Sequence, residues 1–242
     1  MTGRHGGVSE EPYAQLNLGL HVRDDSERVV ENRRRVSRAL GVDFENCTFA
    51  RQVHGDAIHL VADDQPGAGR ERFEEGIPET DGLVANRPGV TIAVLVADCV
   101  PLLIYDPERH VGAAVHAGWR GTAATIAAKA VRFLEEECGS RPDALLVGVG
   151  PAIGSCCYRV GADVVKALEG GSGCQEPLAR EREGRWYVDL VRANRGQLLA
   201  AGIRPENIEA AGICTACQAE EFYSERKLGR PTGRFGAFLS LR

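Results

Sequence analysis

The chain has 242 residues, of which 43% are hydrophobic, so it can form one domain with a substantial core. Its net charge of −5 argues against a nucleic-acid surface, and the arginine run 33–35 lies among glutamates as on a solvated helix face. The N-terminus lacks the apolar run of a signal peptide, and no apolar stretch is long enough to span a bilayer. We therefore expect a cytoplasmic protein that binds neither nucleic acid nor membranes.

The first third of the chain predicts a helix, a hairpin and a long loop. The elements are a helix at 25–40, strands at 48–53 and 57–61, and a loop at 63–80. Asp25 or a neighbouring polar residue can cap the helix, and Gly41 follows its end. The two strands are expected to form a β-hairpin that turns at Gly55-Asp56. The loop is polar and rich in glycine and proline, and loops of this length are often functional lids.

The rest of the chain alternates strand-like and helical patterns. The predicted strands are 90–96, 102–105, 111–117, 145–149, 209–214 and 235–241, and the predicted helices are 122–137, 162–168 and 189–201. Some neighbouring strands can form antiparallel pairs, so we expect an α/β protein with a mixed sheet, in a single domain over residues 1–242. Dinucleotide-binding and P-loop glycine motifs are both missing from the sequence, which leaves those functions without support.

Three segments each carry one metal-ligand side chain at or near the end of a strand-like run. These side chains are His54, Cys99 and His116. Two imidazoles and one thiolate leave a fourth coordination position open, as in a catalytic zinc site. Separations of 45 and 17 residues match no local zinc motif, so spacing alone leaves a satisfied core histidine and a buried thiol as alternatives.

The surroundings of two of these ligands favour a functional site. Gly112 and Ala114 share a strand face with His116, and their small side chains are expected to leave room for a ligand over the imidazole. Asp98 precedes Cys99, where it can orient a ligand or act as a base.

A glycine-flanked turn joins the strand of His116 to the next helix. A helix N-terminus attracts anions, and Arg120 in this turn can add bidentate hydrogen bonds to phosphate. The alternative is that Arg120 faces solvent or forms a salt bridge. We expect the turn to hold phosphate.

Without a secretion signal, the eight cysteines are expected to be reduced thiols. Four of them are an adjacent pair and one CxxC motif, namely Cys156, Cys157, Cys214 and Cys217. A closed four-thiolate zinc site is one interpretation, but a single CxxC without a second at matching spacing is weak support for it. We therefore expect no second metal ion here. Three others should be inert thiols: Cys47, Cys138 and Cys174.

Several motifs together resemble the YfiH family, which has been labelled polyphenol oxidase, laccase-domain protein and purine nucleoside phosphorylase. They span nearly the whole chain, in order, at 16–22, 51–55, 80–82, 97–101, 116–121, 150–154 and 232–234. The resemblance implies one α/β domain with mixed β-sheets layered against helices. It also implies that His54, Cys99 and His116 are the zinc ligands, and it makes Asn17 a candidate substrate-binding residue. The segment 222–227, which contains Glu225, departs from an aromatic-rich segment that is frequent in the family.

The activity implied by the resemblance is zinc-dependent phosphorolysis of adenosine, inosine, guanosine and methylthioadenosine, together with deamination of adenosine. The small-molecule partners are then a purine nucleoside and phosphate, while the oligomeric state is left open. Copper is the alternative metal, because a His₂Cys set also suits a type 1 copper centre of a polyphenol oxidase. Against copper, a multicopper oxidase needs more than the six histidines present.

Two further interpretations remain open on the sequence. The resemblance also includes an editing amidase that acts on a peptidoglycan precursor, and an open zinc site suits amide hydrolysis as well as deamination. The other interpretation is a metal-stabilised interaction protein without catalysis. The open coordination position argues against the latter.

Overall fold

The computed structural model describes residues 1–170 and 177–242, so Cys174 lies outside the described residues. Its α-helices are α1 (Ser26–Leu40), α2 (Trp119–Ala123), α3 (Ile126–Cys138), α4 (Ala162–Glu169), α5 (Leu190–Ala200) and α6 (Glu225–Leu228). None of the helices in this part of the chain has the length and apolar character needed to cross a membrane.

The strands form three sheets. The largest has the order β11-β7-β5-β6-β3-β2 and mixes parallel with antiparallel pairs, whereas the two smaller sheets have the orders β1-β4-β12 and β8-β10-β9. The strand bounds are β1 Cys47–Phe49, β2 Ile58–Leu60, β3 Gly82–Ala85, β4 Thr91–Val96, β5 Val100–Asp106, β6 Val111–Ala117, β7 Leu146–Val149, β8 Arg159–Val160, β9 Ala179–Arg182, β10 Arg185–Val188, β11 Ile208–Ala210 and β12 Phe235–Ser240.

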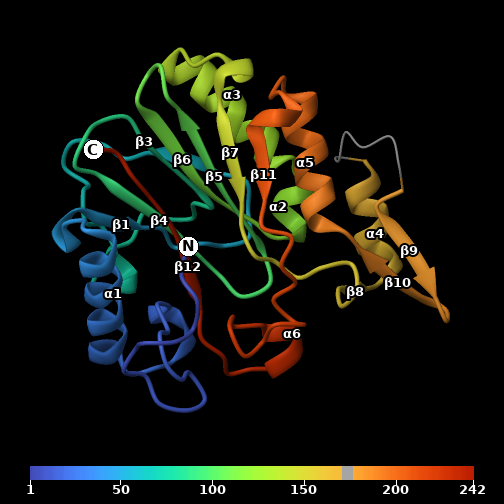
Figure 1. Ribbon diagram of the computed structural model, residues 1–242, viewed down its shortest axis with the longest axis horizontal. Coiled ribbons are helices and arrows are strands. Elements are labelled where there is room, and N and C mark those ends of the chain that lie inside the picture. The colour runs from blue at the N-terminus through green and yellow to red at the C-terminus, as the bar shows by residue number, and fades with distance from the viewer. Residues whose placement is uncertain (171–176) are drawn as a thin grey trace.

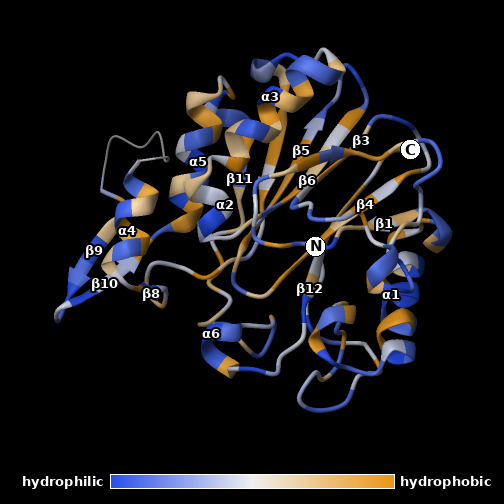
Figure 2. Cartoon of the chain, turned by 180° about the vertical axis from the view of Figure 1, so that it is seen from behind, coloured by the Kyte–Doolittle hydropathy of each residue, from blue (hydrophilic) through white to orange (hydrophobic). Residues whose placement is uncertain are grey.

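The two main sheets pack face to face between helices. In β4, Ile92 and Val94 face the six-stranded sheet, while Ala93 and Leu95 face α1, as the two-residue period of a strand requires. The far side of the six-stranded sheet packs against α3 and α5. Helix α1 thus lies on the opposite side of the sheets from α3 and α5 (Figure 1). Hydrophobic residues line the strands between these layers, and hydrophilic residues gather on the outer helix faces (Figure 2).

Helix α1 follows the expected pattern. The carboxylate of Asp25 accepts hydrogen bonds from the backbone N–H groups of Glu27 and Arg28, and Gly41 ends the helix with φ 65°. The arginine run is only partly a solvated face, because Arg33 is buried and donates to the carbonyl groups of Leu18 and Gly69. That part of the expectation is wrong.

The expected hairpin at 48–61 is also wrong. Strand β1 pairs with β4 in the smaller sheet, and β2 pairs with β3 in the six-stranded sheet. The intervening residues cross from one sheet to the other, and this crossing carries His54. A glycine-containing turn between two apolar runs fits both arrangements, so the local pattern does not distinguish them.

The helix expected at 122–137 is divided into α2 and α3. Thr125 has a φ of 64°, in the left-handed region that interrupts a helix. Helix α2 ends before this break and begins directly after Gly118, next to the strand that bears His116.

Candidate metal centre

The three expected ligands converge. One ligand atom from each of His54, Cys99 and His116 lies within 4.8 Å of the others. They come from the crossing between the sheets, the β4–β5 connection and strand β6 respectively. The two imidazole rings are nearly perpendicular, with their centroids 4.7 Å apart. His116 is buried and His54 is exposed, so the centre opens towards solvent on the side of His54.

The backbone at this centre adopts conformations that side-chain-bearing residues rarely adopt. His54 has a φ of 61°, and Asp98, directly before Cys99, has a φ of 90°. Such residues cost about 1–3 kcal/mol each and persist where the surrounding structure holds them, often at functional sites. Gly118 closes the centre, because a Cβ atom there would lie 3.0 Å from Cδ2 of His54 and 3.2 Å from Sγ of Cys99.

Asp81, which sequence reasoning did not single out as a site residue, connects the two histidines. Its Oδ1 accepts hydrogen bonds from Nδ1 of His116 at 2.7 Å and from the backbone N–H of His54 at 3.0 Å. Its Oδ2 accepts from the N–H groups of Val53 and Gly55 at 3.2 and 2.7 Å. A signal was available, because the aspartate stands at the end of the long polar loop, directly before β3.

The role of Asp81 follows from these contacts. A proton held on Nδ1 of His116 leaves Nε2 free to bind a metal ion, which is the usual carboxylate–histidine–metal arrangement. Burial opposes the charge on Asp81, but the hydrogen bonds from His116 and the backbone outweigh it and lower the pKa of the carboxyl group. Asp81 therefore stays ionised and fixes the orientation of the ring.

Cys99 and His116 form a charged pair in the absence of a metal ion. Burial opposes the thiolate, but attraction to His116 and hydrogen bonds from both histidines lower the pKa of Cys99 to about 6. Burial likewise opposes the imidazolium, but the thiolate of Cys99 and the carboxylate of Asp81 raise the pKa of His116 to about 9. The thiolate is the form that binds metal, and metal binding then displaces the proton from His116.

Both carboxylate oxygens of Asp98 have hydrogen-bond donors away from the three ligands. Oδ1 accepts from Oγ1 of Thr215 and Oδ2 from the backbone N–H of Arg226, each at 2.7 Å. Of the two roles expected for Asp98, these contacts favour orienting the neighbouring Cys99 over acting as a base.

Asn17 is fully buried, and its side chain is occupied by the protein. Its carbonyl oxygen accepts from the N–H groups of Gly19 and Arg234, and its amide nitrogen donates to Asp24. Asn17 thereby joins two segments that the sequence motifs single out. These contacts favour a supporting role for Asn17 over direct contact with substrate.

The small residues beside His116 do not leave room for a ligand. Ala114 lies in the core between the two main sheets, and a Cβ atom at Gly112 would lie 2.7 Å from Leu239 of β12. The small side chains instead allow the two sheets to approach closely. The expectation of free space over the imidazole of His116 is therefore wrong, although the histidine does face the other two ligands.

Three more polar side chains lie around the centre. Burial and the charges of Arg234 and Arg33 lower the pKa of His21 to about 4, so this imidazole is neutral. Burial and the charge of Cys99 raise the pKa of Tyr158 to about 12, so its hydroxyl stays protonated. The guanidinium group of Arg234 is largely buried and pairs with Glu225 at 2.8 Å.

Arg120 is exposed at the start of α2, directly after the residues that close the centre. Its guanidinium group stacks on Trp119, 4.5 Å from the ring centroid. Among residues 1–170 and 177–242, no carboxylate forms a salt bridge with it. Its N–H groups thus remain available to an anion.

Comparison with known proteins shows the family to which the chain belongs. The whole chain, residues 1–242, matches the family described as multi-copper polyphenol oxidoreductase laccase. The chain belongs to this laccase-like YfiH family. The YfiH protein of Bacillus licheniformis, described as hypothetical, has a solved structure that superposes with a TM-score of 0.96 at 38% identity, over 99% of this chain and 91% of that one. The expected α/β fold with mixed sheets is confirmed.

Relatives at this level of similarity carry the names of enzymes. The chain is 41% identical over 244 residues to purine nucleoside phosphorylase YlmD of Geobacillus stearothermophilus, covering all of this chain and 89% of the relative. It is 34% identical over 226 residues to adenosine deaminase RL5 of an unknown prokaryotic organism, covering 92% of this chain and 85% of the relative. The names of these relatives support the expectation that the chain is an enzyme.

Proposed function

We propose that the chain is a zinc-dependent purine nucleoside phosphorylase that also deaminates adenosine. Its proposed substrates are phosphate and the nucleosides adenosine, inosine, guanosine and methylthioadenosine. The observation that carries the proposal is the convergence of His54, Cys99 and His116 on one centre that is open on the side of His54. The names of the relatives supply the substrate class.

The donor set fits zinc. One thiolate and two imidazoles are ligands that zinc accepts, and three protein ligands leave a position for substrate or water. Asp81 holds a proton at Nδ1 of His116, so that Nε2 faces the other ligands. When bound, zinc supplies a Lewis acid that lowers the pKa of water and polarises an electrophile.

The two reactions require different partners for the nucleoside. In phosphorolysis, an oxygen of phosphate bonds to C1′ of the ribose while the bond from C1′ to the purine nitrogen breaks, and its electron pair leaves with the base. In deamination, water replaces the amino group at C6 of adenine and ammonia leaves. Only the first reaction needs a phosphate site, and we assign it to Arg120, the exposed cation beside the ligands.

Product analysis tests the proposed reactions. Purified protein of measured zinc content should convert adenosine to inosine without phosphate, and to adenine and ribose 1-phosphate when phosphate is added. Removal of zinc by a chelator should abolish both conversions, and added zinc should restore them. Turnover that persists in metal-free protein would contradict the proposal.

A variant of Arg120 separates the two reactions. Arg120→Ala should raise the KM for phosphate at least tenfold while deamination changes less than twofold, because only phosphorolysis needs the guanidinium group. Arg132→Ala removes another exposed arginine, on α3, and should alter neither reaction. Equal loss of both reactions in Arg120→Ala, or no loss of either, would show that phosphate binds elsewhere.

The copper alternative gains less support from the described residues. Among them, a single group contains histidines that converge with another metal ligand, and it has the three members already described. A multicopper oxidase needs further histidine ligands for its other copper ions. The same group could hold one copper ion, so the metal content of the active protein separates the two assignments.

A further inference from the structure

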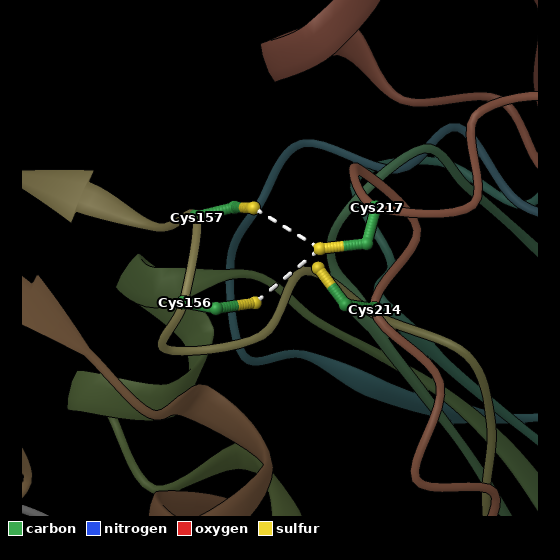
Figure 3. Close-up of side chains that lie close together, drawn as sticks. All are labelled: Cys156, Cys157, Cys214 and Cys217. Carbon is green, nitrogen blue, oxygen red and sulfur yellow. Dashed lines mark hydrogen bonds between the residues drawn. The ribbon is translucent and has the colours of Figure 1, made fainter.

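Four cysteines outside the metal centre also converge. Cys156 and Cys157 lie in the turn between β7 and β8, and Cys214 and Cys217 lie in the loop after β11. One sulfur atom from each lies within 4.8 Å of all the others, and the four side chains point towards one another (Figure 3). Cys156 and Cys217 are exposed, and the other two are partly buried, so the cluster is accessible from solvent.

The spacing of the sulfur atoms matches a shared metal ion. Sγ of Cys217 lies 3.6 Å from Sγ of Cys156 and 3.4 Å from Sγ of Cys157. Four thiolates at about 2.3 Å from a tetrahedral zinc ion lie about 3.8 Å from one another. A disulfide would require a separation of about 2.05 Å, and all four cysteines are free thiols in this structure.

Backbone contacts also hold the two loops together. Ala152 and Cys214 form an isolated parallel bridge between the loops. The N–H group of Gly154 donates to Sγ of Cys214 at 3.2 Å, as backbone N–H groups do to thiolate ligands. A Cβ atom at Gly154 would lie 3.2 Å from Sγ of Cys156 and from Cβ of Cys214, so glycine permits this approach.

We propose that Cys156, Cys157, Cys214 and Cys217 bind a structural zinc ion that joins these two loops. Four thiolates close the coordination shell, which is typical of structural rather than catalytic zinc. Soft thiolate ligands in a tetrahedral arrangement favour zinc over harder cations. The geometry reverses the expectation from the sequence, where one CxxC motif gave weak support for such a site.

Hydrogen bonds connect the two cysteine-bearing loops to Asp98, the residue before Cys99 of the metal centre. Thr215, between the two cysteines of the CxxC motif, donates to the carboxylate of Asp98 at 2.7 Å. The N–H group of Ile153, in the other cysteine-bearing loop, donates to the backbone carbonyl of Asp98 at 2.9 Å. Asp98 directly precedes Cys99, so the structural zinc ion would hold the loops that position a ligand of the catalytic one.

Metal content tests the second site without relying on activity. Full-length protein produced with zinc and freed of loose metal should contain two zinc ions per chain, and the double variant Cys214→Ser/Cys217→Ser should contain one. Cys99→Ala should also lose one ion, and the combination of all three substitutions should lose both. Cys138→Ser is the matched control, because Cys138 belongs to neither cluster, and it should retain two.

Two measurements that do not use the double variant keep the proposal falsifiable if that variant fails to fold. Cobalt bound to the Cys99→Ala chain should give the intense absorption of a tetrahedral four-thiolate complex. Denatured, unreduced wild-type protein should show eight free thiols once a chelator has removed its metal. An unchanged zinc content in Cys214→Ser/Cys217→Ser, a weak cobalt spectrum, iron in place of zinc, or a thiol count reduced by disulfides would overturn the proposal.

Discussion

Replacement of Asp81 by asparagine should weaken metal binding without removing the ligands. Asp81 is fully buried, and its two oxygens accept four hydrogen bonds, from Nδ1 of His116 and from the N–H groups of three consecutive residues around His54. Asparagine keeps the shape but turns an N–H₂ group towards N–H donors. Loss of a carboxylate that orients a ligand histidine typically costs 10–100-fold in metal affinity, or about 1.4–2.7 kcal/mol.

The same substitution should also lower the stability of metal-free protein. A hydrogen bond to a charged group contributes about 1.5–3 kcal/mol, so loss of one or two of the four predicts a decrease of about 2–5 kcal/mol in the free energy of unfolding. Urea unfolding of the metal-free chain measures this separately from metal binding.

Competition with a zinc-binding indicator gives the dissociation constant of the Asp81→Asn chain. The comparison should be made in the background Cys214→Ser/Cys217→Ser, so that one site is titrated. Asp56→Asn is the matched control, because Asp56 directly follows Gly55 but pairs with Lys129 instead of with the centre, and the zinc affinity of this variant should be unchanged. A dissociation constant of Asp81→Asn within twofold of its parent would refute the reasoning.

Three further predictions concern reactivity, space and packing. In chelator-treated protein, iodoacetamide should modify Cys99 with a midpoint near pH 6, because the pKa of this thiol is lowered and its thiolate fraction rises through that pH. Burial raises the pKa of Cys138, so Cys138 should react only at higher pH. Peptide mass spectrometry measures both midpoints, and equal midpoints would contradict the prediction. Gly118→Ala should weaken zinc binding in the indicator assay by crowding the ligands, whereas Gly148→Ala, which has nothing within 4 Å of the added Cβ, should leave it unchanged. Ile104→Ala should lower the free energy of unfolding by about 2–5 kcal/mol, because the residue is fully buried in the core against α3 and α5; a loss below about 1 kcal/mol in urea unfolding would contradict this.

Local chemistry in the sequence predicted part of this structure. Helix α1 could be located from its cap and its terminal glycine, and several strands from their apolar runs, because these signals depend on neighbours along the chain. The hairpin at 48–61 could not be excluded, because strand partners are chosen between segments that lie far apart in the sequence. Tertiary packing places β1 and β2 in different sheets, and the local sequence pattern contains no information about that packing.

The same limit applies to the sites. Ligand types and the resemblance singled out His54, Cys99 and His116, whereas spacing alone left alternatives open. Asp81 acts through hydrogen bonds to two segments far from it in sequence, and no single motif describes that role. The thiol cluster likewise depends on two loops that meet only in the folded chain, since Cys157 and Cys217 are 60 residues apart.

The wide separation of the ligands in the sequence ties metal uptake to completion of the fold. The crossing that carries His54, the connection that carries Cys99 and strand β6 are brought together only when β3, β5 and β6 have paired. A metal ion that binds the folded chain alone adds about 2.7 kcal/mol of stability when its free concentration is 100 times its dissociation constant. The lifetime of the protein should therefore follow the supply of metal in its surroundings, because a chain without metal unfolds more often and is then open to proteolysis.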